Sequence, residues 1–352
     1  MTDPLLDRLV DWEMARATAR RLARPGPVVS AAEAADVVAE LRQLAVSAQP
    51  HVEAITGLHA PSKDAVVMVV DRPGWVAANL VSLRAMLEPV VDKLTAKRKT
   101  EPHPLVAAVG GKVTGAEAGG LLAFLSSKVL GQYDINPGGT PRLLLVAPNM
   151  VATEREMGVD PTDFRRWVCL HEETHRVQFT AVPWLRQHLM DQAQALATDL
   201  APDPAALART LEDVARRLPG VLRGDGGSLL DLFATAAQRE QLATVTAVMS
   251  LLEGHADVVM DEVGPSVVPT VAVIRERFTE RRGGGTPVDK LLRRLLGLDD
   301  KMRQYKDGAR FVRGVIDEVG MKGFNAVWTS PQTLPTPAEV ADPGAWVRRV
   351  HA

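Results

Sequence analysis

The sequence has little cysteine, few aromatic residues and almost no excess of charge. Its 352 residues include one cysteine, which excludes an intramolecular disulfide framework. Aromatic residues make up 4%, and 41 basic side chains nearly balance 43 acidic ones. We therefore expect no nucleic-acid partner, because neither a basic surface nor stacking platforms are indicated. No run reaches the roughly 18 consecutive apolar residues that span a bilayer, so no membrane partner is expected either.

Location and domain organisation follow from the same composition. Residues 1–8 include acidic side chains and lack the apolar stretch of a secretory signal, so we expect a cytoplasmic protein. A chain of this length with 46% hydrophobic residues can bury a large core. We expect one domain over 1–352, with a helical part (1–130), a metal-binding core (131–265) and a second helical part (266–352). The sequence does not predict the oligomeric state.

Helical periodicity dominates, so the expected fold class is mainly α (α+β), with a small β-sheet beside the central helix. Helices are expected over 4–22, from a capping Ser30 onward, over 75–94 and over 116–130. Residues 142–148 are the best strand candidate, because they are short, apolar and bounded by turn residues. Residues 65–70 fit either a buried strand or a helix. Later helices are expected near 184–198, 204–217, 228–251, 252–263, 269–281, 287–296 and 300–319.

The most informative segment is His171-Glu172-Glu173-Thr174-His175. Residues four apart on a helix lie about 40° apart around its axis, so the two histidines would share one face. Two imidazoles on one face can bind one zinc ion, and the glutamate after the first can act as a base toward a water molecule. This pattern predicts a metal-dependent hydrolase with Zn²⁺ as its cofactor.

The surrounding residues favour a helix at this motif. Asp160 is a typical N-cap, Pro161 suits the first helical position, and no glycine or proline follows until Pro183. The alternative is a buried helix whose two histidines are hydrogen-bonded core residues. Burying these polar groups costs free energy unless they are paired, so the metal hypothesis is favoured. Cys169 would lie about 200° from His171, and we expect it to pack in the core.

A catalytic zinc site needs a third protein ligand, and Glu253 is the strongest candidate. It lies in an apolar helical segment, and Asp257 follows four residues later on the same face. Asp257 could accept a hydrogen bond from a ligand histidine, with a solvated face or a salt bridge as the alternative. His255 is a second candidate ligand, but it points about 200° away from Glu253, so the two are not expected to bind one metal.

This combination is similar to the gluzincin pattern of thermolysin-like metallopeptidases. The resemblance implies His171, His175 and Glu253 as zinc ligands, Glu172 as the general base and Asp257 as the carboxylate that supports a ligand histidine. The segment between His175 and Glu253 departs from the pattern, because it is longer than in thermolysin and could hold two or three more helices.

The chain as a whole resembles an actinobacterial zincin-like metallopeptidase family, one branch of which is associated with biosynthesis of the deazaflavin coenzyme. Two metal motifs and three further segments carry the resemblance: 69–75, 130–134, 144–149, 171–175 and 252–257. The family implies a zincin-like fold and a hydrolase, and no particular substrate.

The predicted function is hydrolysis of a peptide or another amide bond by metal-activated water. Tyr305 is the candidate that stabilises the oxyanion, with a surface tyrosine as the alternative, and His255 is a second candidate. By resemblance to zincins, the strand at 142–148 could pair with an extended substrate, or it could be an ordinary core strand. The alternative functions are an inactive metal-binding or scaffold protein with a partner, and an amidohydrolase acting on a small metabolite.

Overall fold

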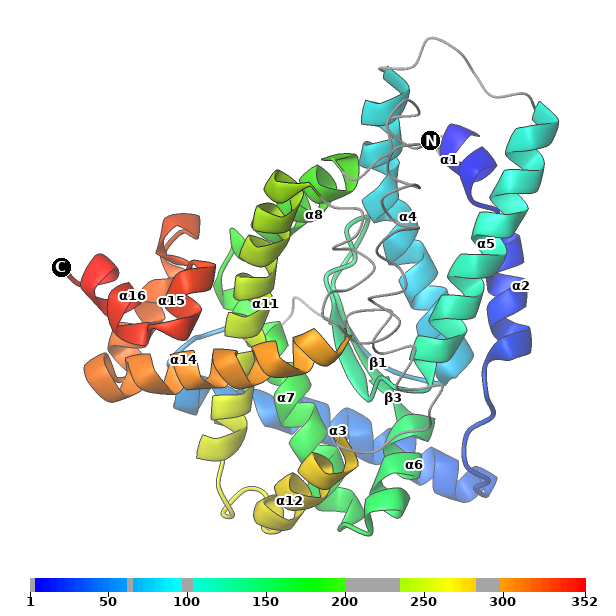
Figure 1. The fold of residues 1–352 in the computed structure, drawn as a ribbon. Coiled ribbons are helices and arrows are strands. Elements are labelled where there is room, and N and C mark those ends of the chain that lie inside the picture. Colours follow the sequence, from blue (N-terminus) through cyan, green and yellow to red (C-terminus); the bar gives the residue numbers. More distant parts are fainter. Residues whose placement is uncertain (1–3, 62–65, 97–103, 200–234, 283–297) are drawn as a thin grey trace. The chain divides into compact units, whose positions relative to one another are not determined.

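The computed structural model describes residues 4–61, 66–96, 104–199, 235–282 and 298–352 (Figure 1). These residues form mainly α-helices and a three-stranded sheet, which confirms the expected fold class. The chain divides into two compact units, residues 1–181 with 262–277 and residues 182–261 with 278–352. The single domain stays a prediction.

Five helices form the N-terminal part of the first unit. They are α1 (Pro4–Leu9), α2 (Trp12–Leu22), α3 (Ala31–Thr56), α4 (Arg72–Ala96) and α5 (Pro104–Ser126). The single helix expected over 4–22 is wrong, because the side chain of Asp11 accepts a hydrogen bond from the Met14 amide (2.8 Å) and begins a second helix. The expected cap of α3 is confirmed, since Ser30 Oγ accepts from the Glu33 amide at 3.1 Å.

The sheet has the strand order β1-β3-β2. Strand β1 (Val66–Val70) runs parallel to β3 (Arg142–Val146), with Val66 opposite Arg142, and β2 (Gly131–Asp134) runs antiparallel to β3. The strand expected at 142–148 is thus confirmed over 142–146, and residues 66–70 prove to be a strand rather than a helix. The proposed substrate-pairing role of 142–148 is wrong, because both sides of β3 are already hydrogen-bonded within the sheet. Strand β2 pairs with β3 alone and is therefore an edge strand of the described sheet, on the side away from β1.

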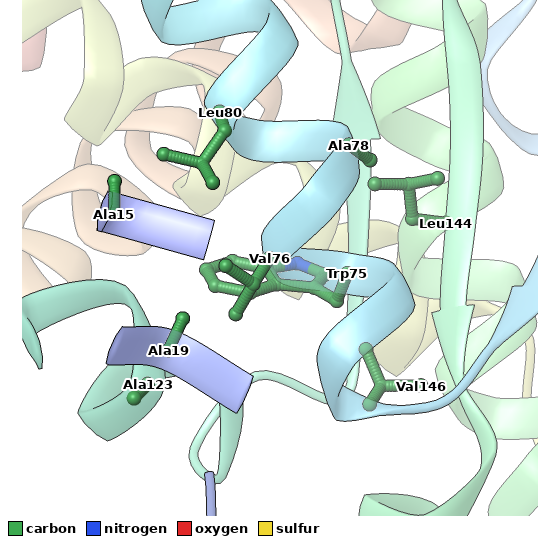
Figure 2. Packing of buried hydrophobic residues seen from close by; sticks show 9 residues of the cluster. All are labelled: Ala15, Ala19, Trp75, Val76, Ala78, Leu80, Ala123, Leu144 and Val146. Carbon is green, nitrogen blue, oxygen red and sulfur yellow. The ribbon is translucent and has the colours of Figure 1, made fainter. Parts of the chain in front are cut away.

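A hydrophobic core joins this sheet to the N-terminal helices. Trp75 of α4 lies at its centre and is 4% exposed (Figure 2). The other members of the cluster come from α2, α4, α5 and β3: Ala15, Ala19, Val76, Ala78, Leu80, Ala123, Leu144 and Val146. Several of them are alanines, which allows helix backbones to approach closely. This core fixes β3, and through β3 the edge strand β2.

Two helices follow β3, α6 (Ala147–Met157) and α7 (Pro161–Ala181). Asp160 caps α7 as expected, with its Oδ1 accepting from the Asp163 amide at 2.9 Å. Helix α7 packs against α3 and against β2. The histidine motif therefore lies in the middle of a buried helix beside the edge strand of the sheet.

The remaining α-helices of the described residues are α8 (Leu185–Asp199), α11 (Ala236–Glu262), α12 (Val271–Arg282), α14 (Leu298–Phe324), α15 (Pro337–Ala341) and α16 (Pro343–Val350). The boundary expected near 251 is wrong, since α11 continues through it without interruption. The helices expected at 204–217 and 287–296 lie outside the described residues.

Helix α11 crosses α14 at unusually short distance. A methyl group on Gly254 would lie 2.2 Å from the carbonyl carbon of Gly308, so both positions need glycine. By length and hydropathy, α11 could also cross a membrane, but 56% of its most apolar stretch is buried in the structure. Buried core helices meet the same criteria, so this is weak evidence for a membrane span.

Candidate metal centre

His171 and His175 project from the same face of α7, as the sequence predicts. Their Nε2 atoms lie 3.3 Å apart, and the rings meet edge to face with centroids 4.9 Å apart. Two zinc ligands at about 2.0–2.1 Å from a tetrahedral metal would lie roughly 3.3 Å from each other. The spacing of these two nitrogen atoms therefore suits a zinc ion.

Gln178 fixes the orientation of the second histidine. Its side chain is fully buried, and its Oε1 lies 3.0 Å from His175 Nδ1. With the Nδ1 proton donated to this oxygen, Nε2 keeps its lone pair and becomes the nitrogen available to a metal. Gln178 was not predicted from the sequence, although its position one turn after His175 on the same helix was a usable signal.

The predicted third ligand, Glu253, lies on α11 in the other compact unit. Two imidazole nitrogens and one carboxylate oxygen are a usual donor set of catalytic zinc sites, which leave a fourth position open. His171, His175 and Glu253, here called the metal group, are therefore donors of the types that fit zinc.

Glu172, the candidate base, is buried at 7% exposure and lies against the start of β2. A methyl group placed on Gly131 would come within 2.5 Å of its Cγ and 2.8 Å of its Oε1. The backbone of the edge strand therefore lies directly against this side chain.

Buried groups fill the other faces of α7. Glu173 and Arg176 form an ion pair with side chains 2% and 7% exposed, and burial raises the pKa of the Glu173 carboxyl despite its partner. Cys169 is fully buried, which confirms that it packs in the core, and burial raises the pKa of its thiol far above the ordinary value. Neither the ion pair nor the thiol belongs to the metal group.

The remaining predicted residues have different surroundings. His255 is fully buried, with its ring stacked on Phe324 at 5.3 Å, so its position favours packing over a role at the metal. Asp257 Oδ2 lies 3.9 Å from Arg313 Nη2, which agrees with the alternative of a salt bridge. The role of Asp257 in supporting a ligand histidine stays a prediction. Tyr305 belongs to α14, but its side chain lies outside the described part of the structure, so its role also stays a prediction.

A helix bearing His-Glu-x-x-His beside a small sheet is typical of the zincin class of metal-dependent hydrolases. A family model described as zincin-like metallopeptidase matches residues 10–347. The chain therefore belongs to the zincin-like metallopeptidase family.

The chain is also similar to a protein of known structure from Chloroflexus aurantiacus, described as a proposed hydrolase with a novel fold. The two share 29% sequence identity and a TM-score of 0.69, over 97% of this chain and 99% of the other. No curated protein matches.

Proposed function

We propose that this protein is a zinc-dependent hydrolase that cleaves a peptide or another amide bond, with His171, His175 and Glu253 as the metal ligands. The observation that carries the proposal is the spacing of the two imidazole nitrogens on α7, which lie 3.3 Å apart and suit a zinc ion. The family membership supports the same reaction class.

Glu172 and Gln178 have different roles in the proposed reaction. A bound zinc ion would lower the pKa of a water molecule toward neutrality and polarise the substrate carbonyl. Glu172 accepts a proton from the attacking water as its oxygen bonds to the carbonyl carbon. As the carbon–nitrogen bond breaks, Glu172 returns that proton to the leaving amine. Gln178 holds His175 in the tautomer that presents Nε2.

The substrate would lie along β2. This strand is an edge of the described sheet and contacts α7, which carries the candidate base. An extended peptide can add to such an edge through main-chain hydrogen bonds. Gly131, at the start of β2, adjoins Glu172, so a peptide paired there would pass close to the base.

The first test combines metal content with hydrolysis. We expect the purified protein to hold about one zinc per chain and to cleave members of a fluorescence-quenched peptide library. Replacing Glu253→Ala should weaken zinc binding by at least about tenfold, measured by competition with a chelating dye. Glu262→Gln, an exposed carboxylate on the same helix, is the matched control and should bind zinc like the wild type.

Two results would contradict the proposal. Wild-type zinc affinity in Glu253→Ala would remove this residue from the ligand set. A protein that binds zinc and cleaves no peptide or small amide would instead favour the alternative function, a metal-binding scaffold with a protein partner.

A second prediction concerns Gln178. The change Gln178→Leu keeps a similar volume but removes the acceptor for His175 Nδ1–H, so zinc affinity should fall by about 10- to 100-fold. Gln187→Leu is the control, because it removes an exposed side-chain amide on α8 in the same way. Unchanged zinc affinity in Gln178→Leu would show that the histidine keeps its tautomer without this bond.

The branch of the family and the cellular location are proposed from the sequence alone. The shared segments support a place in the actinobacterial family, while membership of its deazaflavin-associated branch and the cytoplasmic location stay predictions. Both can be tested in the native organism, by metabolite analysis of a deletion strain and by cell fractionation.

A further inference from the structure

Gly131 is the residue of β2 that lies against Glu172. A methyl group built at this position would come within 2.5 Å of Glu172 Cγ, 2.7 Å of Cδ and 2.8 Å of Oε1. Real methyl groups are not found at such distances from other heavy atoms. Any side chain at position 131 would therefore have to move Glu172.

Backbone conformation does not explain this glycine. The glycines with positive φ among the described residues are Gly57, Gly158, Gly264 and Gly320, so Gly131 has a conformation open to other residues. Glycine within a strand is also unfavourable, because it gains no packing and loses more chain entropy on folding. The lack of a side chain at position 131 is thus required by space, and the group that occupies this space is the Glu172 carboxylate.

The atoms displaced by a methyl group belong to the end of a flexible side chain. Glu172 can rotate away at small cost to folding, whereas a clash with main-chain atoms would destabilise the protein. A base that has moved by about 1 Å is expected to lose much of its catalytic effect, even though the rest of the site is intact. The contact can therefore matter for turnover far more than for stability.

We propose that Gly131 is a positioning residue, whose bare backbone forms the surface against which the Glu172 carboxylate is held. Its effect on turnover rests on the function proposed above, with Glu172 as the base. The contact itself depends only on α7 and β2, which lie in the same compact unit.

The test compares Gly131→Ala with the wild type, both loaded with zinc. We expect zinc content and melting temperature to stay close to wild-type values, kcat on a cleaved library peptide to fall about 100-fold, and KM to change little. A crystal structure of the variant should show the Glu172 carboxylate displaced. Gly120→Ala is the control, because its methyl group would lie 3.9 Å from Leu22 Cδ1, an ordinary van der Waals contact.

A double variant separates positioning from a general structural effect. In a Glu172→Gln background, Gly131→Ala should lower kcat no further, since the base is already absent. Wild-type kcat in Gly131→Ala, or an undisplaced carboxylate in its crystal structure, would overturn the proposal. Should the variant not fold, Gly131→Ala combined with Glu172→Ala must restore folding, and continued misfolding would overturn the proposal as well.

These outcomes are distinct from failure of the proposed function. If the wild type cleaves no peptide or amide, the hydrolase assignment fails. The position of the Glu172 carboxylate in the variant structure still decides whether Gly131 holds it.

Discussion

Replacing Glu172→Gln is expected to abolish most hydrolysis while leaving zinc in place. The amide has nearly the same shape as the carboxylate but cannot accept a proton from water, so the rate should fall by roughly 10²- to 10⁴-fold. His171, His175 and Glu253 are unchanged in this variant, and zinc content should therefore equal that of the wild type. Steady-state kinetics and metal analysis on the same preparation measure both quantities.

Glu156→Gln is the matched control, because this glutamate lies exposed on α6. It should retain wild-type kcat and zinc content. If Glu172→Gln keeps its activity, Glu172 is not the base. If Glu172→Gln loses zinc as well as activity, its role in the site is structural rather than catalytic.

Local sequence signals predicted the helix that carries the candidate site. Asp160 and Pro161 mark its start, and four-residue spacing places His171 and His175 on one face; all of this depends on short-range geometry. Glu253 could also be proposed, because a carboxylate in an apolar helix requires a partner. Its role as the third ligand stays a prediction.

Contacts between distant segments were not predictable in the same way. Strand β2 has only four residues, too few for a periodic pattern, so its role as the edge strand was missed and was assigned to β3 instead. The approach of Gly131 to Glu172 depends on how β2 packs against α7. A glycine in sequence signals a turn or a close approach, but it does not identify the group that approaches.

On α7, His171 and His175 lie next to buried charged side chains. Glu173 and Arg176 lie between and beside the two histidines, and their ion pair is almost completely removed from water. Each charge is tolerated because the other is present. The stability of the helix that carries the two histidines therefore depends on this ion pair.

Replacing Arg176→Met should consequently destabilise the metal-free protein by about 3–5 kcal/mol, because it leaves the Glu173 carboxylate buried without its partner. Urea unfolding in the presence of a chelator measures this change without the contribution of bound metal. Burial already raises the pKa of Glu173, and losing Arg176 should raise it further. The folded variant then binds a proton more tightly than the unfolded chain, so its deficit should grow as the pH rises above the usual carboxyl range and shrink below it.

The double variant Glu173→Leu/Arg176→Met tests whether the unpaired Glu173 charge causes the loss of stability in Arg176→Met. Removing both charges leaves no buried ion, so the double variant should be more stable than Arg176→Met alone. The exposed pair Asp307 and Arg310 has the same three-residue spacing, with side chains 45% and 62% exposed. Arg310→Met should therefore change the free energy of unfolding by less than about 1 kcal/mol. Equal losses of unfolding free energy in Arg310→Met and Arg176→Met would show that burial does not determine how much an ion pair contributes to stability. In that case α7 would not depend on the pair of Glu173 and Arg176.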